Sequence, residues 1–222
     1  MQIIIFSYNR KEKLTRLIDE LIEPIGKKNI TVIDDGSEWS KDTFFAPSTL
    51  TRFPHTGKKG FYKKWDFAID YFLESEHEEV LFLPDDVKDV DLKTIKAIIN
   101  QGWKNVPFAV NVINDGREFC WGRFKTGQRA VSINEVEFRE VGFVDCGFLS
   151  NRHTMSQIKI DRISESWFDR PDKSSGVGHQ LTKKFRKLGV KMLSPDKSLA
   201  YHGNHKSEMH TEHRKKNPLI SE

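Results

Sequence analysis

Two adjacent carboxylates, Asp85 and Asp86, follow directly after the apolar segment 79–83 and Pro84. A short run of Val, Leu and Phe that ends in proline is typical of a buried strand in a parallel sheet. Ligands of open α/β sheets bind just beyond the carboxyl ends of such strands. Two carboxylates at that place repel each other unless a cation lies beside them, and Mg²⁺ or Mn²⁺ takes carboxylate oxygens while leaving room for phosphate. The pair therefore predicts a divalent-metal site; the alternative is a solvated turn that caps the helix after Asp91.

A second polar motif, Asp34-Asp35-Gly36-Ser37, ends another apolar segment, residues 30–34. These residue types also build tight turns, which is the alternative interpretation. If both apolar segments are parallel strands of one sheet, the two acidic pairs lie at the same edge and share a cleft.

The elements that position these motifs alternate between strands and helices. Strands are expected at 2–7, 30–34, 79–83, 107–113 and 190–193, and helices at 10–23, 60–75, 91–101 and 178–188. Apolar residues recur at helical spacing in the first helix, and Asn9 with Glu12 resembles a capping box at its start. Gly189 suits the position just beyond the last helix. The alternation predicts an α/β fold, a three-layer α/β/α sandwich around a central, mostly parallel sheet.

The segment 117–150 departs from this alternation. It carries aromatic and β-branched residues together with turn signals at Gly122, Gly127 and Asn134. That pattern predicts a small antiparallel flap. The residues beyond 203 are polar and are expected to form a loose tail.

Composition describes an ordinary soluble protein, with 31% charged and 37% hydrophobic residues in a chain of 222. No apolar run approaches the roughly 20 residues that cross a bilayer, and the N-terminal apolar run lacks the basic start of a signal peptide. The two cysteines, Cys120 and Cys146, fit no zinc or redox motif. We therefore expect the protein in a reducing cytoplasm, of a bacterial cell or of an infected host cell.

The net charge of +4 is unevenly distributed along the chain. Basic residues cluster at 58–64, 183–187 and 213–216. Each cluster can be a solvated face, but together they suit a partner that carries phosphates, whether a nucleotide, a nucleic acid or an anionic surface.

Four motifs now stand in order along the expected sheet. They are Phe6-Ser7-Tyr8-Asn9-Arg10, Ile33-Asp34-Asp35-Gly36-Ser37, Leu83-Pro84-Asp85-Asp86 and Ala200-Tyr201-His202-Gly203-Asn204. This order resembles the nucleotide-sugar-dependent glycosyltransferases of the A-type fold, in particular the large family 2-like group. The resemblance extends from residue 2 to about residue 210. It implies one domain at 1–210, with a nucleotide-binding half at 1–104 and an acceptor-side half at 105–210, followed by a polar tail at 211–222.

The resemblance also implies roles for individual residues. Asp86 matches the acid that contacts the metal directly, and His202 matches a further metal or phosphate ligand, although a lone histidine is more often structural. Asp34 and Asp35 match residues that accept hydrogen bonds from the base and ribose. Lys59 and Gly60 match a loop at a helix start, where side chains and the helix dipole bind anions, with a solvated face as the alternative. The full set assigned to the donor is Ser7, Tyr8, Asn9, Arg10, Asp34, Asp35, Lys59, Gly60, Asp85 and Lys206.

The chain departs from the family pattern where inverting members carry Gly-Glu-Asp. Val177 and Gly178 stand at the acidic positions, in front of a matching helix. An inverting reaction needs a base within hydrogen-bond reach of the acceptor hydroxyl. His179, Asp169 or Asp172 is a candidate for that base, or the reaction retains configuration and needs none. Asp145, in a segment that resembles the strand beside the donor sugar, either contacts a sugar hydroxyl or caps a turn.

The implied function is metal-dependent transfer of a hexose or pentose from a nucleoside diphosphate sugar, expected to be UDP-linked, to an acceptor hydroxyl with Mn²⁺ or Mg²⁺ as cofactor. The acceptor is a glycan, a lipid-linked glycan or a modified DNA base. The specific alternative is a phage-type enzyme that glycosylates hydroxymethylated pyrimidines, because aromatic and basic residues in the flap suit flipped or stacked bases. Those residues are Trp121, Arg123, Phe124, Lys125 and Arg129. A second alternative is a catalytically silent nucleotide-sugar-binding module; a dinucleotide-binding dehydrogenase is not supported, because no Gly-x-Gly-x-x-Gly follows the first strand.

Overall fold

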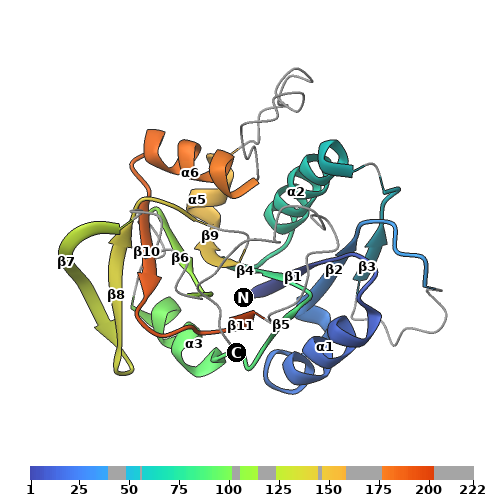
Figure 1. Cartoon of the computed structure of the whole chain (residues 1–222), viewed down its shortest axis with the longest axis horizontal. Coiled ribbons are helices and arrows are strands. Elements are labelled where there is room, and N and C mark those ends of the chain that lie inside the picture. Colours follow the sequence, from blue (N-terminus) through green and yellow to red (C-terminus); the bar gives the residue numbers. More distant parts are fainter. Residues whose placement is uncertain are drawn as a thin grey trace, which may run out of the picture.

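The computed structural model describes residues 1–39, 49–55, 57–101, 106–114, 124–144, 147–158 and 177–202, with only the backbone at 57–62, 124–130, 179 and 202. A nine-stranded sheet forms the centre of the molecule, in the order β3-β2-β1-β4-β9-β6-β10-β8-β7 (Figure 1). Its strands are β1 (Gln2–Ser7), β2 (Ile30–Asp34), β3 (Thr49–Arg52), β4 (Glu79–Pro84), β6 (Phe108–Asn111), β7 (Phe124–Ile133), β8 (Val136–Val141), β9 (Phe148–Asn151) and β10 (Lys191–Pro195).

Helices cover both faces of this sheet. They are α1 (Lys11–Ile25), α2 (Gly57–Glu74), α3 (Leu92–Asn100), α5 (Arg152–Ser156) and α6 (Val177–Lys187), with a short 3-10 turn, η1 (Lys27–Asn29), between α1 and β2. Figure 1 shows α1 and α3 on one face, and α2, α5 and α6 on the other. The predicted three-layer α/β/α sandwich is therefore confirmed. No helix in the described part of the chain is both long and apolar enough to cross a membrane.

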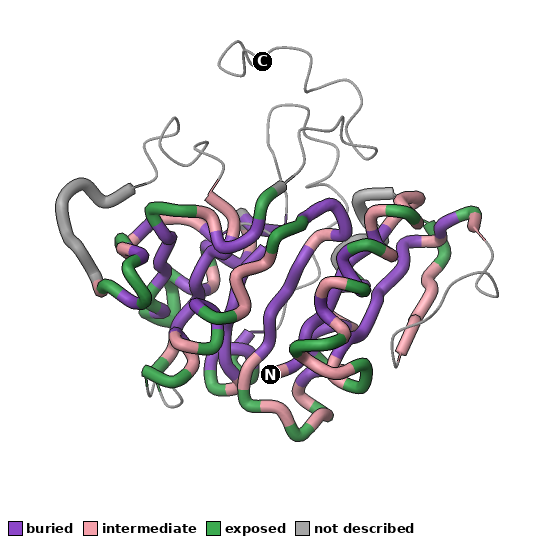
Figure 2. The backbone as a smooth tube through the Cα atoms, turned by 90° about the horizontal axis from the view of Figure 1, so that it is seen from below, coloured by how far each residue is buried: buried purple, intermediate pink, exposed green. Residues whose placement is uncertain are grey.

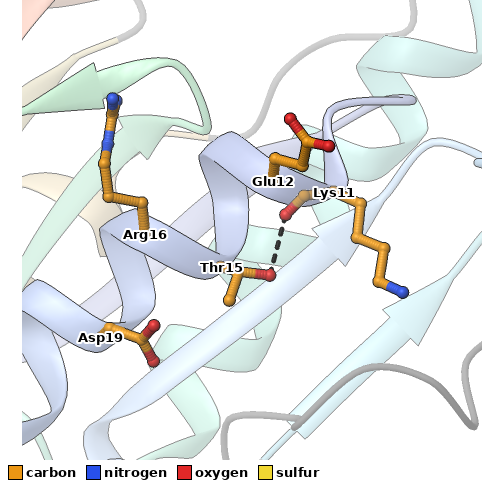
Figure 3. Close-up of a pocket in the computed structure, with 5 residues that line it drawn as sticks. All are labelled: Lys11, Glu12, Thr15, Arg16 and Asp19. Atoms are coloured by element: carbon orange, nitrogen blue, oxygen red, sulfur yellow. Dashed lines mark hydrogen bonds between the residues drawn. The ribbon is translucent and has the colours of Figure 1, made fainter.

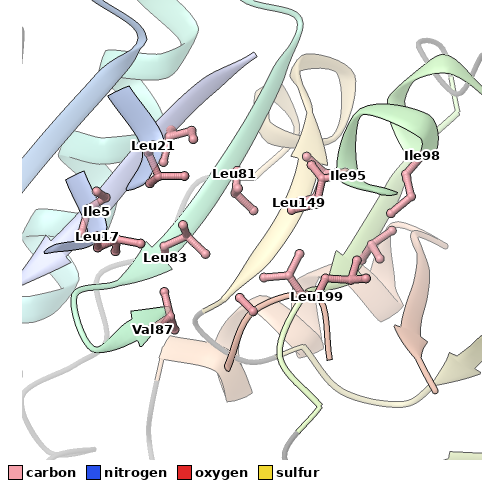
Figure 4. Close-up of a cluster of buried hydrophobic side chains, with 14 of the residues drawn as sticks. Ile5, Leu17, Leu21, Leu81, Leu83, Val87, Ile95, Ile98, Leu149 and Leu199 are labelled. Carbon is pink, nitrogen blue, oxygen red and sulfur yellow. The ribbon is translucent and has the colours of Figure 1, made fainter. Parts of the chain in front are cut away.

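The alternation of side chains along the strands divides the core into two layers. In β1, Ile3 and Ile5 pack with α1, whereas Ile4 and Phe6 pack with the helices on the opposite face, as the two-residue period of a strand requires. Figure 4 shows the first layer, where α1 and α3 meet the strands. Figure 2 shows the strands buried, with exposed residues along the outer faces of the helices.

The sheet is mixed, and its two halves differ. From β3 to β4 every neighbouring pair is parallel, and β6 with β10 is also parallel. β9 lies antiparallel between β4 and β6, and the β7–β8 hairpin continues the sheet antiparallel beyond β10. The antiparallel strands predicted for 117–150 are present in its described part, where the hairpin extends the main sheet and β9 lies inside it.

The start of α1 also differs from the prediction. Arg10 precedes the helix without a side-chain hydrogen bond that caps it. Asn9 has a positive φ of 51°, and its side-chain oxygen accepts a 2.8 Å hydrogen bond from the backbone N–H of Glu38. The capping-box prediction for Asn9 and Glu12 is therefore wrong, since Asn9 instead ties the end of β1 to the turn after β2.

A second, two-stranded sheet lies beside the main one. β5 (Val87–Lys88) pairs antiparallel with β11 (Tyr201–His202), so that His202 stands opposite Val87. The backbone N–H of Asp91 also donates to the carbonyl of Leu199, at 2.7 Å. The end of the described chain is thereby joined to the loop that follows β4.

Candidate functional site

The carboxyl ends of β1, β2 and β4 lie side by side and gather the predicted motifs. Ser7 is in register with Asp34 across β1 and β2. The backbone N–H of Asp35 donates to the carbonyl of Ser7 at 2.8 Å, and that of Asp85 donates to the carbonyl of Phe6 at 3.0 Å. The two acidic pairs therefore share one edge of the sheet, as expected for strands β2, β1 and β4 in parallel.

Asp85 is held by the segment that follows β1. Its Oδ2 accepts hydrogen bonds from the Ser7 hydroxyl at 2.8 Å and from the Tyr8 backbone N–H at 3.2 Å, and its Oδ1 accepts one from Arg10 at 2.9 Å. Burial raises the pKa of Asp85 to about 6, against the opposing effects of Arg10 and of the Ser7 hydrogen bond. Asp85 therefore links the first and third motifs.

Arg10 lies between the two carboxylates of the β4 motif. The same nitrogen, Nη1, is 2.9 Å from Asp85 Oδ1 and 2.8 Å from Asp86 Oδ2. The two aspartate side chains are each 2% exposed, and the Arg10 side chain is 13% exposed. The cation expected beside the Asp pair is thus supplied here by the protein itself.

Asp34 organises the turn after β2. Its carboxylate is fully buried and accepts hydrogen bonds from the Ser37 hydroxyl, from the Ser37 N–H at 3.2 Å and from the Arg52 guanidinium. Arg52 lies over the ring of Trp39, 4.4 Å from its centroid. A role for Asp34 in holding base or ribose stays a prediction; in the structure its carboxylate builds the turn.

Asp35 is neutralised by a lysine that the sequence placed on the surface. Lys64, on α2, forms an ion pair with Asp35 Oδ1, and His55 Nδ1 lies 3.2 Å from Asp35 Oδ2. The Lys64 side chain is 2% exposed, so its assignment to a solvated or phosphate-binding cluster is wrong. Burial lowers the pKa of Lys64 to about 8, against the attraction of Asp34. The His55 ring stacks on Tyr8 with centroids 4.4 Å apart, so an aromatic pair borders this carboxylate.

Gly36 allows the turn to pass close to the chain beyond β3. Its φ is +77°, and a Cβ on it would lie 2.5 Å from the backbone nitrogen of His55 and 2.8 Å from the carbonyl oxygen of Phe53. The Ser37 hydroxyl beside it accepts a 2.8 Å hydrogen bond from the Asn9 N–H. Glycine at this position is therefore required by backbone conformation and by space.

His202 is brought next to the acidic pair by the small sheet. Because His202 pairs with Val87, its backbone lies beside the residue that follows Asp86. This is the arrangement that a shared ligand site requires of two segments so far apart in sequence. The pairing brings the His202 backbone near Asp86, and a role of His202 as a ligand stays a prediction.

Several predicted site residues have no described side chain. Asp145, Asp169, Asp172 and Lys206 lie outside the described residues. Lys59 and Gly60 fall in the first turn of α2, and His179 in the first turn of α6, with the backbone alone described.

At the position where the family carries its acids, the structure shows an apolar contact. Val177 is 2% exposed and packs in the core with Leu181 and Phe185. Val177 therefore does not serve as a general base at this position.

An open hollow lies elsewhere, on the outer face of α1 (Figure 3). Its lining residues are Lys11, Glu12, Thr15, Arg16 and Asp19. The Thr15 hydroxyl donates to the carbonyl of Lys11 at 2.9 Å, so that polar group is used within the helix. All five residues come from one helix and none belongs to the strand-end motifs, which separates this hollow from the candidate site.

The residues at the strand ends are chemically suited to a divalent cation. Asp85 and Asp86 supply hard carboxylate oxygens, and a guanidinium already occupies the space between them. Within the described residues, no three His, Cys, Asp or Glu side chains come together as a preformed metal centre. The described residues therefore offer a cation two carboxylates.

Comparison with known proteins gives structural matches alone, since no protein-family model and no curated protein matches the chain. The galactosyltransferase LgtC, in complex with donor and acceptor sugar analogues, is similar with a TM-score of 0.50 and 15% identity, over 86% of this chain and 73% of its own. Glucosyl-3-phosphoglycerate synthase from Mycobacterium tuberculosis, in complex with Mn²⁺, UDP-glucose and phosphoglyceric acid, is similar with a TM-score of 0.56 and 12% identity, over 92% and 71%. The mannosyltransferase PcManGT from Pyrobaculum calidifontis, in complex with GDP-mannose and Mn²⁺, gives 0.52 and 15%, over 94% and 58%.

The fold is that of the A-type glycosyltransferases, and the predicted fold is confirmed. At these identities the likeness establishes the fold.

Proposed function

We propose that this protein is a glycosyltransferase that moves a hexose or pentose from a nucleoside diphosphate sugar, UDP-linked by preference, to an acceptor hydroxyl with the help of a divalent cation. The observation that carries the proposal is the meeting of three sequence-distant segments at one sheet edge. Ser7 and Arg10 contact Asp85 directly, and the β5–β11 pairing brings the His202 backbone beside Asp86. Ligands of α/β sheets bind at this edge.

The site divides into two parts with different tasks. The stacked rings of Tyr8 and His55 offer an aromatic surface for a nucleoside, and His55 also contacts the buried Asp35. The second part, with Asp86 beside Arg10, is suited to a diphosphate and its cation. Asp34 supports the first part by fixing the turn that carries Asp35.

Asp86, Asp85 and His202 are the residues that we propose to hold the cation. A bound Mn²⁺ or Mg²⁺ supplies Lewis-acid stabilisation of the charge on the departing nucleoside diphosphate. The chain's own contribution is to hold the carboxylates at the strand ends through Ser7 and the Tyr8 N–H, which orients Asp85 before any ligand binds.

The test is a donor assay with purified protein and a panel of UDP-glucose, UDP-galactose, UDP-xylose and GDP-mannose. Release of the free nucleotide above background, abolished by EDTA and restored by Mn²⁺, is the expected result. Binding of a nucleotide sugar without any hydrolysis or transfer, across a broad acceptor panel, would instead support the silent binding module.

A nucleic-acid acceptor is the second candidate, and one observation on α6 favours it. Lys183, Arg186 and Lys187 are exposed on the helix that follows the position of the missing acids. Exposed cations in a row suit a phosphate backbone. A salt titration of binding to duplex and single-stranded DNA, followed by transfer assays on hydroxymethylated DNA, separates this acceptor from a glycan. Absence of DNA binding at low salt would exclude a nucleic-acid acceptor and leave a glycan as the acceptor.

A further inference from the structure

The one guanidinium placed between Asp85 and Asp86 has a consequence for how the site is filled. Arg10 Nη1 contacts one oxygen of each carboxylate, at 2.9 and 2.8 Å. These are the oxygens that converge on the space between the two side chains. A divalent cation bound by both aspartates needs the same space.

We propose that Arg10 is a placeholder cation, which neutralises the buried Asp85–Asp86 pair in the metal-free protein and must leave when a divalent cation binds. This inference rests on the proposed metal-dependent function and adds the regulation of the same site. The proposal makes metal binding a competition between a protein side chain and the ion.

Charge balance explains why the pair needs a placeholder. Each aspartate side chain is 2% exposed, so burying two adjacent ionised carboxylates carries a large desolvation and repulsion cost, which a cation in contact with both lowers. One guanidinium offsets one of the two negative charges, whereas a divalent ion offsets both. A guanidinium and a divalent ion that contact the same two oxygens would repel each other, which disfavours simultaneous occupancy.

The way in which Arg10 binds explains why it can leave. It uses a single nitrogen for both carboxylates and does not form the two-nitrogen fork that makes arginine–carboxylate pairs strong. Its Nε is buried without a hydrogen-bond partner among the described residues. The arginine side chain is also the more exposed member of the group, at 13% against 2% for each aspartate. A long side chain in that position can move without rearranging the strands.

Asp34 and Arg52 provide a matched control. They form a buried aspartate–arginine pair at the end of the neighbouring strand β2, and the aspartate is also fully buried. That pair is further held by Ser37 and by the stacking of Arg52 on Trp39. Loss of Arg52 therefore removes a pair of the same kind at a place where no cation is proposed to enter.

The test measures binding of Mn²⁺ alone to the full chain, without donor, by the electron paramagnetic resonance signal of free Mn²⁺. Arg10→Gln is expected to bind Mn²⁺ about tenfold or more tightly than the wild type, because a charge-assisted competitor is removed. Arg52→Gln is expected to bind Mn²⁺ as the wild type does. Arg10→Gln with unchanged or weaker Mn²⁺ affinity would overturn the proposal, since Arg10 would then be a support for the site.

A measurement on the wild type covers the case in which Arg10→Gln does not fold. Titration with Mg²⁺ is expected to shift the Nε–Hε NMR signal of Arg10 and to leave that of Arg52 in place. An unmoved Arg10 signal at saturating Mg²⁺ overturns the proposal. This failure can be told apart from failure of the proposed function. Nucleotide release that persists in EDTA would support a transferase that needs no metal, whereas absence of release from every donor would contradict the transferase itself.

Discussion

Replacement of Gly36 by alanine tests whether the turn after β2 holds the site in place. A residue other than glycine in the left-handed region costs about 1–2 kcal/mol. The added Cβ would also lie 2.5 Å from the His55 nitrogen and 2.8 Å from the Phe53 carbonyl oxygen, so one of these backbone segments must move. Movement of the turn breaks the hydrogen bonds that Ser37 makes to Asp34 and Asn9, each of which contributes about 1 kcal/mol. The expected total is about 3 kcal/mol or more.

Gly189 gives the matched control for this substitution. It has a similar φ of +68°, and nothing lies within 4 Å of the Cβ that alanine would add. Gly189→Ala therefore carries the backbone cost of about 1 kcal/mol without a steric clash. In a protein of this size each kcal/mol lowers the melting temperature by about 2–4 °C. The melting temperature of Gly36→Ala should therefore be roughly 10 °C below that of the wild type, and that of Gly189→Ala about 3 °C below it.

The assay combines thermal unfolding with calorimetric binding of UDP. Gly36→Ala is expected to weaken UDP binding, because the turn carries Asp35, whereas Gly189→Ala should bind UDP as the wild type does. Equal melting temperatures for the two variants would refute the reasoning, since the contacts of Gly36 with His55 and Phe53 would then add nothing to the cost of a positive φ.

Three other perturbations test separate features. Asp86→Ala is expected to reduce nucleotide release from the donor about 100-fold or more, because the cation that stabilises the charge on the leaving diphosphate loses a protein ligand. Full turnover at low Mn²⁺ would contradict the metal assignment. The pKa of Lys64 is lowered from 10.5 to about 8, so between these pH values the unfolded chain binds more protons than the folded protein. The free energy of unfolding should therefore rise from about pH 8 to 10.5 in the wild type, and rise less in Lys64→Met. Urea midpoints of the two proteins that change in parallel with pH would refute this. Arg152→Ala should destabilise the fold by about 3 kcal/mol, because its guanidinium donates to carbonyl oxygens within residues 72–77 at the end of α2; a urea midpoint equal to that of the wild type would show that these bonds contribute nothing.

The first half of the fold was predictable from sequence because its signals are local. The apolar segments that end in Asp34 and Asp85 have the length and composition of buried strands, and the helices between them carry clear apolar stripes. Right-handed crossovers then place these strands in parallel, with their carboxyl ends together.

The second half was not predictable in the same way. β9 has four residues and lies antiparallel between β4 and β6, two strands that parallel topology alone would place as neighbours. Strand order depends on contacts between segments distant in sequence, which periodicity does not record. The two-residue strands β5 and β11 are too short for any sequence pattern to indicate.

The partners of the carboxylates were the part of the site that sequence analysis missed. Arg52, His55 and Lys64 all lie within the site, and none was assigned to it. Lys64 had a detectable signal, because it precedes Trp65 and lies four residues before Ala68, two inward positions of α2. Arg52 and His55 had none, since they stand at and after a short strand at the edge of the sheet.

The strand order also determines when each part of the site can form during synthesis. β3, β2, β1 and β4 are neighbours in the sheet and are all contained within residues 2–84, so they can pair as soon as that part of the chain is available. β6 must wait, because its two neighbours, β9 and β10, are both C-terminal to it. We expect the acidic edge to assemble first in a nascent chain, and the second half to add to the β4 edge of a preformed half-sheet. Until β9 arrives, that edge is open to pairing with other chains, which makes the synthesis of residues 85–151 the interval of greatest aggregation risk.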